Sequence, residues 1–261
     1  MPSVADYTQS VTLLLSECGK YLGLLALSVL AIRLWRRVPR VSGTNRKQTL
    51  GLALAISLAA AATGYLSICH SLGRMNYAYG MRAFHRGNVG SAFTLFQGAR
   101  SYWKSADSVG AEGVCLLLLN QPGAGFQRLE RAKTMRHGAN SWFELYYTGI
   151  YLFFNGKADD AAPLLQASTA NVEYQWDAQK LLAVIMLEQG KCSEAARLMQ
   201  PYAAVEVKEC DHAYVLAWLK LNENKPLEAR ALLQKFPPES LDEFWKPRFE
   251  KLRARAQTAP S

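Results

Sequence analysis

The chain has 261 residues, a formal net charge of +9 at pH 7 and a hydrophobic content of 50%. A basic excess of this size does not indicate nucleic-acid binding, which requires a clustered stripe of Lys and Arg. Five cysteines without a C-x-x-C pair do not indicate a metal or redox site. No catalytic pair or phosphate loop stands out either, so we expect a protein that is not an enzyme and needs no cofactor or metal.

The first apolar segment, residues 11–34, is a candidate transmembrane helix that two charges interrupt. Glu17 and Lys20 lie three residues apart, so they can form an ion pair on one helix face near the membrane surface, with the lysine reaching outward. The alternative is a polar contact with another membrane subunit. Gly19 and Gly23 form a small-xxx-small pair that permits close packing of a second helix.

The second apolar segment, Thr49–Cys69, contains no charged residue. About 20 residues at about 1.5 Å each span the hydrocarbon core of a bilayer, so we predict a second transmembrane helix over residues 49–70. Gly51, Ala55 and Ala59 form a ladder of small residues along it. Such a ladder permits either packing inside a helical hairpin or docking of a partner helix, and the sequence does not separate the two.

The predicted loop between the two helices, residues 35–48, is strongly basic and has no acidic residue. Short basic loops stay on the cytoplasmic side of a membrane. We therefore expect an integral membrane protein, with a bacterial inner membrane as the expected location. Its N-terminus and everything after residue 72 would lie outside the cytoplasm. The basic residues that set this topology are Arg33, Arg36, Arg37, Arg40, Arg46 and Lys47.

A pattern recurs five times between Tyr77 and Phe236. Each unit has a small residue, a turn residue seven positions later, another small residue five positions after that, and an apolar residue after four more. The turn residues are 33, 36, 34 and 34 positions apart, a period typical of stacked helix pairs. The five units are Gly80–Gly87–Ala92–Phe96, Gly113–Asn120–Gly125–Leu129, Gly149–Gly156–Ala161–Leu165, Ala183–Gly190–Ala195–Met199 and Ala217–Asn224–Ala229–Leu233.

These units resemble the tetratricopeptide repeat (TPR) family over residues 73–243. The resemblance implies an α-solenoid of about five helix pairs, with Gly or Ala where paired helices approach closely. It also implies Gly or Asn in the left-handed conformation at each turn. The family's last small position holds Tyr202 and Phe236 in the final two units, and the proline that usually ends each repeat is missing. The predicted fold is all-α, with a transmembrane hairpin over residues 1–72 before the solenoid.

In the TPR family, the first helix of each repeat lines a concave groove that binds other proteins. Mapping the family's groove positions onto this chain gives an aromatic and apolar surface, which suits an amphipathic helix. Only Lys180 matches the positions that grip a C-terminal carboxylate in chaperone-docking members. The alternative is a narrow groove whose aromatic side chains belong to the core. The expected partner-binding residues are Tyr77, Phe84, Phe143, Tyr146, Phe153, Phe154, Tyr214 and Trp218.

Residues 244–261 are predicted to form a C-terminal capping helix and tail. Ser240 followed by Glu243 has the spacing of a capping box, which starts the helix at Leu241. A polar-backed helix of this kind covers the last apolar face of a solenoid. Its basic residues form either a solvated face or a contact for anionic lipid or an acidic partner. They are Lys246, Arg248, Lys251, Arg253 and Arg255.

The expected function is that of a non-catalytic scaffold that binds a protein partner at the extracytoplasmic membrane face during assembly of a membrane or envelope complex. The layout resembles the TPR subunit of bacterial cytochrome c maturation, a chaperone that takes its partner's C-terminal helix. The alternative is a permanent accessory subunit of a respiratory, photosynthetic or secretion complex. We expect protein partners and membrane lipid, and no nucleic acid.

Overall fold

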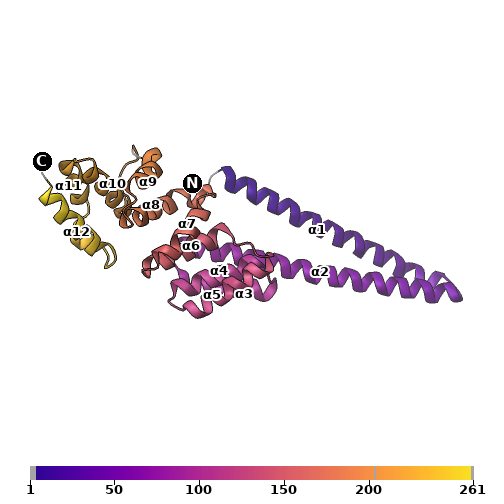
Figure 1. The fold of residues 1–261 in the computed structure, drawn as a ribbon. Coiled ribbons are helices and arrows are strands. Elements are labelled where there is room, and N and C mark those ends of the chain that lie inside the picture. Colours follow the sequence, from indigo (N-terminus) through magenta and orange to yellow (C-terminus); the bar gives the residue numbers. More distant parts are fainter. Residues whose placement is uncertain (1–3, 203, 260–261) are drawn as a thin grey trace. The chain divides into compact units, whose positions relative to one another are not determined.

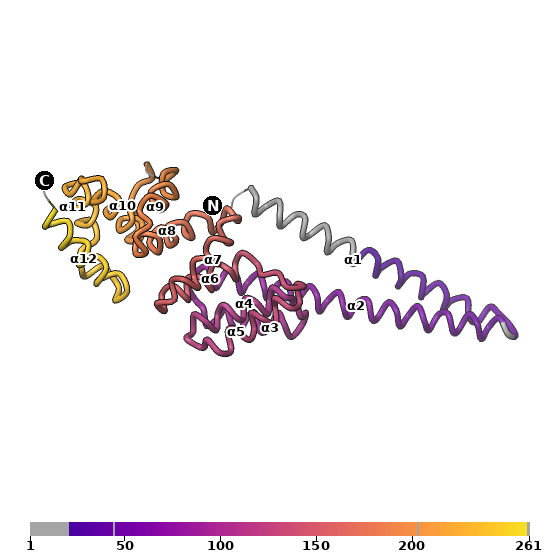
Figure 2. The backbone as a smooth tube through the Cα atoms, in the orientation of Figure 1, coloured from indigo at the N-terminus to yellow at the C-terminus, as the bar shows by residue number. Residues whose placement is uncertain are grey.

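The computed structural model describes residues 4–202 and 204–259, with side chains from residue 21 onward except that of Thr44 (Figure 1). Every regular element in these residues is helical, as the sequence predicted. Twelve α-helices and three short 3-10 helices follow one another along the tube in Figure 2. The chain divides into two compact units, Met1–Glu112 and Gly113–Ser261.

The first unit begins with two long helices. α1 (Val4–Arg37) runs into the 3-10 helix η1 (Val38–Arg40), and α2 (Thr44–His85) begins three residues later. The predicted loop over residues 35–48 is therefore mostly helical, and only Val41–Gly43 lies outside the helices. Arg and Lys have high helix propensity, so both helices continue beyond their apolar stretches.

α1 and α2 pack along a face of small residues. Ala53 and Ala60 of α2 are buried there. A Cβ atom on Gly64 would lie 3.4 Å from the side chain of Leu24, which is ordinary contact distance. Because no bulky side chain projects from α2 at these positions, the two backbones approach closely.

The ladder predicted from the sequence lies on a different face. Gly51, Ala55 and Ala59 are exposed, and so is Gly23 on α1. Packing inside the hairpin therefore does not use these described residues, and their contact with a partner helix stays a prediction. The residues singled out at the start of the first segment, Glu17, Gly19 and Lys20, lie among side chains that the structure does not describe.

In the part of the chain that the structure describes, one helix is long and apolar enough to cross a membrane, Asn45–His85. The helix meets this criterion by its length and its composition. Large apolar side chains point outward from it, and Leu58 is 70% exposed. The described part of α1 shows the same feature at Leu22 and Leu25. The predicted first span, residues 11–34, is only partly described, so the two-helix hairpin stays a prediction.

The first repeat uses the end of α2 as its first helix. α2 has no break between the predicted membrane span and the repeat, and it pairs with α3 (Val89–Tyr102). A Cβ atom on Gly80 would lie 2.6 Å from the ring of Phe96, closer than real Cβ contacts allow. The small residue is therefore required by the close approach, as the repeat pattern predicted. α4 (Ala106–Leu118) starts in this unit and ends in the next.

The second unit contains the remaining repeats and the C-terminal helix. Each repeat is a pair of helices joined by a tight turn. The helices are α5 (Pro122–Met135), α6 (Trp142–Phe154), α7 (Ala158–Ser168), α8 (Val172–Glu188), α9 (Cys192–Met199), α10 (Cys210–Asn222), α11 (Pro226–Gln234) and α12 (Trp245–Thr258), with 3-10 turns at Gln200–Tyr202 and Pro238–Ser240.

All five predicted turn residues have a positive φ angle. Asn120 and Asn224 have φ angles of 58° and 57°. Gly87, Gly156 and Gly190 have φ angles of 76°, 75° and 78°. This left-handed conformation ends a helix and satisfies its last carbonyl groups, and few residues other than Gly and Asn adopt it easily. The predicted turns are confirmed.

The C-terminal helix begins later than the sequence predicted. Ser240 and Glu243 do not form the expected capping box, and α12 starts at Trp245 rather than at Leu241. The carboxylate of Asp242 instead accepts a hydrogen bond from the Trp245 backbone N–H at 2.9 Å. An aspartate three residues before a helical N–H has the right reach to cap it, whereas Leu241 is extended.

Candidate partner-binding site

A hollow of about 310 Å³ lies in the second unit, on the first helices of the last three repeats. The first helices of the repeats are those expected to line a TPR groove. One wall is apolar and is formed by Tyr146, Ile150, Phe154, Leu181 and Trp245. The lining also includes one basic and three acidic side chains: Lys180, Asp177, Glu209 and Asp211.

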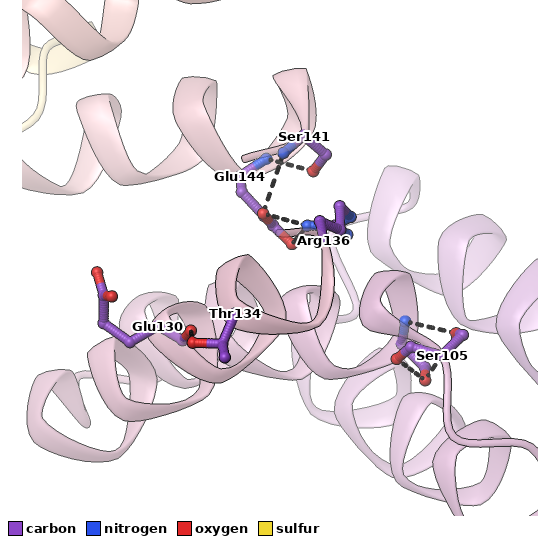
Figure 3. A network of polar contacts seen from close by, with 7 residues as sticks. Ser105, Glu130, Thr134, Arg136, Ser141 and Glu144 are labelled. Atoms are coloured by element: carbon purple, nitrogen blue, oxygen red, sulfur yellow. Dashed lines mark hydrogen bonds and ion pairs between the residues drawn. The ribbon is translucent and has the colours of Figure 1, made fainter. Parts of the chain in front are cut away.

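The helix that supplies the aromatic wall, α6, is fixed at its start by a capping box (Figure 3). The Glu144 backbone N–H donates to the Ser141 hydroxyl at 3.3 Å, and the Ser141 backbone N–H donates to the Glu144 carboxylate at 3.1 Å. Arg136 donates to the same carboxylate at 2.8 Å. Two otherwise unpaired N–H groups are thus satisfied, which holds the first turn of α6 in place.

Lys180 is the buried charge of the site. It is 1% exposed, and its ammonium lies 2.9 Å from Asp177 and 3.3 Å from Asp211. Glu209 binds the same ammonium. Removing an ammonium from water costs several kcal/mol, so a buried lysine requires such carboxylates. The ammonium also lies 5.0 Å from the ring centroid of Trp176, which adds a cation–π contact.

The protonation states follow from burial and from these charges. Burial alone would lower the pKa of Lys180, but the three carboxylates outweigh burial and raise it. Burial raises the pKa of Asp211, although Lys180 opposes this. Burial also raises the pKa of the Cys210 thiol, to about 11. At neutral pH one ammonium faces three carboxyl groups, so the hollow has an excess of negative charge.

The apolar wall contains a stack of tyrosines. The ring of Tyr146 on α6 stacks on that of Tyr174 on α8, with centroids 4.9 Å apart and planes 20° apart. Tyr147 lies against both rings. Burial raises the pKa of Tyr146, so its hydroxyl stays neutral. Stacking of this kind stabilises the packing of α6 on α8 beyond the burial of apolar area.

The segment that precedes α12 covers part of the same wall. The ring of Phe244 lies 4.4 Å from that of Phe154 and 5.1 Å from that of Phe153, measured between centroids. Arg248 donates to Glu188 on α8 at 2.8 Å. The C-terminal helix thus narrows the groove, and the hollow beside Asp177 is the part that stays open.

Comparison with known proteins supports the repeat fold. No protein-family model matches this chain, and no curated protein matches its sequence. A solved structure from a study titled as the functional characterization of Pseudomonas aeruginosa pilF, a TPR-containing protein, is similar with a TM-score of 0.52 and 16% identity. The match covers 72% of this chain and 90% of pilF. The chain has a TPR-type fold. At this identity the similarity concerns the fold alone.

Most residues expected to line the TPR groove are part of the core. Phe154 is 41% exposed and lines the hollow, and Tyr77 and Trp218 are half-buried. The others are buried, as expected for a narrow array whose aromatic groove positions belong to the core, although Tyr146 still contributes to the lining of the hollow. The buried residues are Phe84, Phe143, Tyr146, Phe153 and Tyr214.

The acidic side of the hollow was not among the residues expected to contact a partner. Asp177 and Asp211 occupy groove positions of the family pattern, so the pattern could have indicated them. Glu209 precedes α10 and Phe244 precedes α12, in connecting segments that have no periodicity. No sequence signal places these two side chains beside the hollow.

Proposed function

We propose that this protein is a non-catalytic, membrane-anchored scaffold whose TPR-type repeats hold a protein partner at the extracytoplasmic membrane face. Helices of this repeat type form interaction surfaces, which supports a protein partner. The apolar, exposed surface of α2 supports the anchor. The basic residues at the end of α1, in η1 and at the start of α2 support a cytoplasmic position for that connection. A role in assembly of a membrane or envelope complex accords with these features.

The chemistry of the hollow supports one kind of partner. An aromatic wall beside an excess of carboxylates fits an amphipathic helix that presents an apolar side chain next to Lys or Arg. The hollow between Phe154 and Asp177 is the observation that carries this proposal. The layout also supports a chaperone similar to the TPR subunit of cytochrome c maturation.

The experiment is recovery of partners on the tagged full chain from gently solubilised membranes. In the test variant, Asp177→Asn removes one partly exposed charge and keeps the shape of the side chain, while Glu209 and Asp211 still bind the ammonium of Lys180. We expect recovery to fall at least fivefold, and more strongly at low salt than at high salt. The matched control is Glu194→Gln, an exposed carboxylate on α9 away from the hollow. Equal recovery by both folded variants would contradict the assignment.

A second function is favoured by one observation, the exposed ladder on α2. Gly51, Ala55 and Ala59 are not used against α1, so they are open to a neighbouring membrane helix. A permanent accessory subunit of a large membrane complex would use such a face. Ala55→Phe should then remove co-purifying subunits present at equal stoichiometry. Partners present in small amounts and unaffected by Ala55→Phe would instead support the scaffold.

A further inference from the structure

The corner between α3 and α4 lies next to the end of the apolar stretch of α2. From the turn at Gly87, α3 runs back along α2 and ends beside Gly73. A Cβ atom on Gly73 would lie 2.6 Å from Cβ of Trp103, so the corner touches the α2 backbone itself. Gly73 is four residues from Cys69, where the uncharged stretch ends, which is about 6 Å along the helix.

The corner presents aromatic side chains to the outside. Tyr102 is 47% exposed and Trp103 is 41% exposed, and Lys104 follows them, also exposed. The indole ring of Trp103 is held edge-to-face against His70 of α2, with ring centroids 4.8 Å apart. Clefts of about 650 Å³ and about 590 Å³ both include Trp103 in their walls, so open space lies beside the indole.

Local hydrogen bonds fix this corner, and Figure 3 shows those of Ser105. The Trp103 backbone N–H donates to the Ala99 carbonyl at 2.9 Å, which ends α3. The Ser105 hydroxyl accepts from the Ser108 backbone N–H at 3.1 Å, near the start of α4. These bonds fix the end of α3 and the start of α4. The backbone that carries the exposed side chains of the corner is therefore held in one conformation.

Such a group of side chains fits the boundary between lipid tails and headgroups. Tyr and Trp have an apolar ring and a polar atom, and they collect at the membrane interface. A lysine beside them reaches toward anionic headgroups. Tyr65, one of the residues in the wall of the second cleft, is exposed on the apolar stretch of α2 and extends the aromatic surface toward the tails.

We propose that Tyr102, Trp103 and Lys104 form a phospholipid-binding surface at the headgroup level, which holds the first repeat against the bilayer. The proposal rests on the membrane anchoring in the proposed function. Continuity supports it, since the corner packs on the same helix that leaves the bilayer about one turn earlier. It adds to that function a site outside the groove, with a phospholipid as its ligand.

The test places a photo-crosslinking amino acid, benzoylphenylalanine, at single positions of the full chain. The protein is reconstituted in vesicles of phosphatidylcholine and phosphatidylglycerol at a ratio of 3:1, and lipid adducts are measured by mass spectrometry. Tyr102 is the test position. Leu58 reports on anchoring, because it is exposed on the apolar stretch of α2. Trp142, an exposed aromatic residue at the start of α6, is the control.

We expect lipid adducts at Leu58 and Tyr102, with at least a fivefold lower yield at Trp142. Adducts at Leu58 without adducts at Tyr102 would overturn this inference and leave the membrane anchoring intact. A lack of adducts at Leu58 would overturn the anchoring and with it the inference. An equal yield at Tyr102 and Trp142, or adducts with protein instead of lipid at Tyr102, would also overturn the lipid surface.

The charge of the corner is tested separately. Lys104→Glu should lower the ratio of phosphatidylglycerol to phosphatidylcholine adducts at Tyr102 at least twofold. Lys191→Glu, an exposed lysine at the start of α9, should leave this ratio unchanged. Circular dichroism of both variants is the control that checks whether they keep their helical content. If Lys104→Glu leaves the ratio of phosphatidylglycerol to phosphatidylcholine adducts unchanged, Lys104 is not part of the lipid-binding surface.

Discussion

The guanidinium of Arg248 lies over the ring of Phe244, with its central carbon 3.8 Å from the ring centroid. The same guanidinium donates to the carboxylate of Glu188 on α8 and to the carbonyl of Phe244. One side chain therefore fastens the start of α12 to the first helix of the fourth repeat. This arrangement keeps Phe244 against the aromatic wall of the groove.

Replacing Arg248 by alanine should loosen this attachment. We expect the unfolding free energy to fall by about 1 kcal/mol, since a partly exposed cation–π contact and ion pair each contribute a fraction of that amount. Urea unfolding of the detergent-solubilised chain measures it. Lys246→Ala, at an exposed position on the same helix, should change stability by less than about 0.5 kcal/mol. An equal effect of both substitutions would show that Arg248 has no special role.

Phe153 and Phe154 should respond very differently to truncation. Phe153 is 1% exposed, so Phe153→Ala leaves a cavity and should cost about 3–5 kcal/mol. Phe154 is 41% exposed, so Phe154→Ala should cost less stability than Phe153→Ala while lowering partner recovery. Unfolding and partner recovery measured on the same two preparations separate the roles. Comparable stability loss in both variants would contradict the assignment of Phe154 to the surface.

The close approach of α6 and α7 at Gly149 predicts a steric effect. A Cβ atom there would lie 2.8 Å from the buried side chain of Leu165, which has no room to move. Gly149→Ala should therefore destabilise the protein by about 1–3 kcal/mol. In Gly123→Ala the new Cβ meets nothing within 4 Å, so a small gain in stability is expected. Thermal unfolding midpoints that move in the same direction would disprove the contact.

The buried imidazole of His212 predicts a loss of stability in acid. It is buried, and its Nε2 atom has no hydrogen-bond partner among the described residues. Burial lowers the pKa of His212 below its ordinary value of 6.5, and Lys180 lowers it further, while Glu209 opposes both. A group with a lowered folded pKa gives stability above pH 6.5 that is lost as the pH falls through the folded pKa.

The measurement is the urea midpoint of the wild type and of His212→Gln between pH 7.5 and pH 5. We expect the wild type to lose stability over this range and His212→Gln to lose less. Asp211 acts in the opposite sense. Its pKa is raised above 3.8 by burial, so its protonation favours the folded state as the pH falls. Parallel pH profiles for the two proteins would exclude His212 as the cause.

The repeat turns were predictable because their geometry admits few residues. A left-handed φ angle favours Gly or Asn, so Asn120 and Asn224 identify helix ends by residue type alone. Gly80 and Gly149 were equally informative, because the backbone of a paired helix leaves no space for a side chain. These constraints are local in sequence, and a period of about 34 residues repeats them.

The groove was less predictable because burial depends on distant segments. Phe153 occupies a groove position by its spacing, but a loop almost a hundred residues later brings Phe244 onto it. Glu209 reaches Lys180 from outside any helix. The start of α12 was predicted wrongly for a related reason. Ser240 has the right spacing for a helix cap, but the Trp245 backbone N–H donates to the carboxylate of Asp242 instead.

Because α2 is one continuous helix, rotation of its apolar stretch about the helix axis also rotates the first repeat. An α-helix turns about 100° and rises about 1.5 Å with each residue. One residue inserted between Cys69 and Gly73 would therefore turn the face of the first repeat by more than a quarter of a revolution. In the membrane-anchored protein proposed above, the continuous α2 would therefore fix the angular position of the first repeat relative to the bilayer.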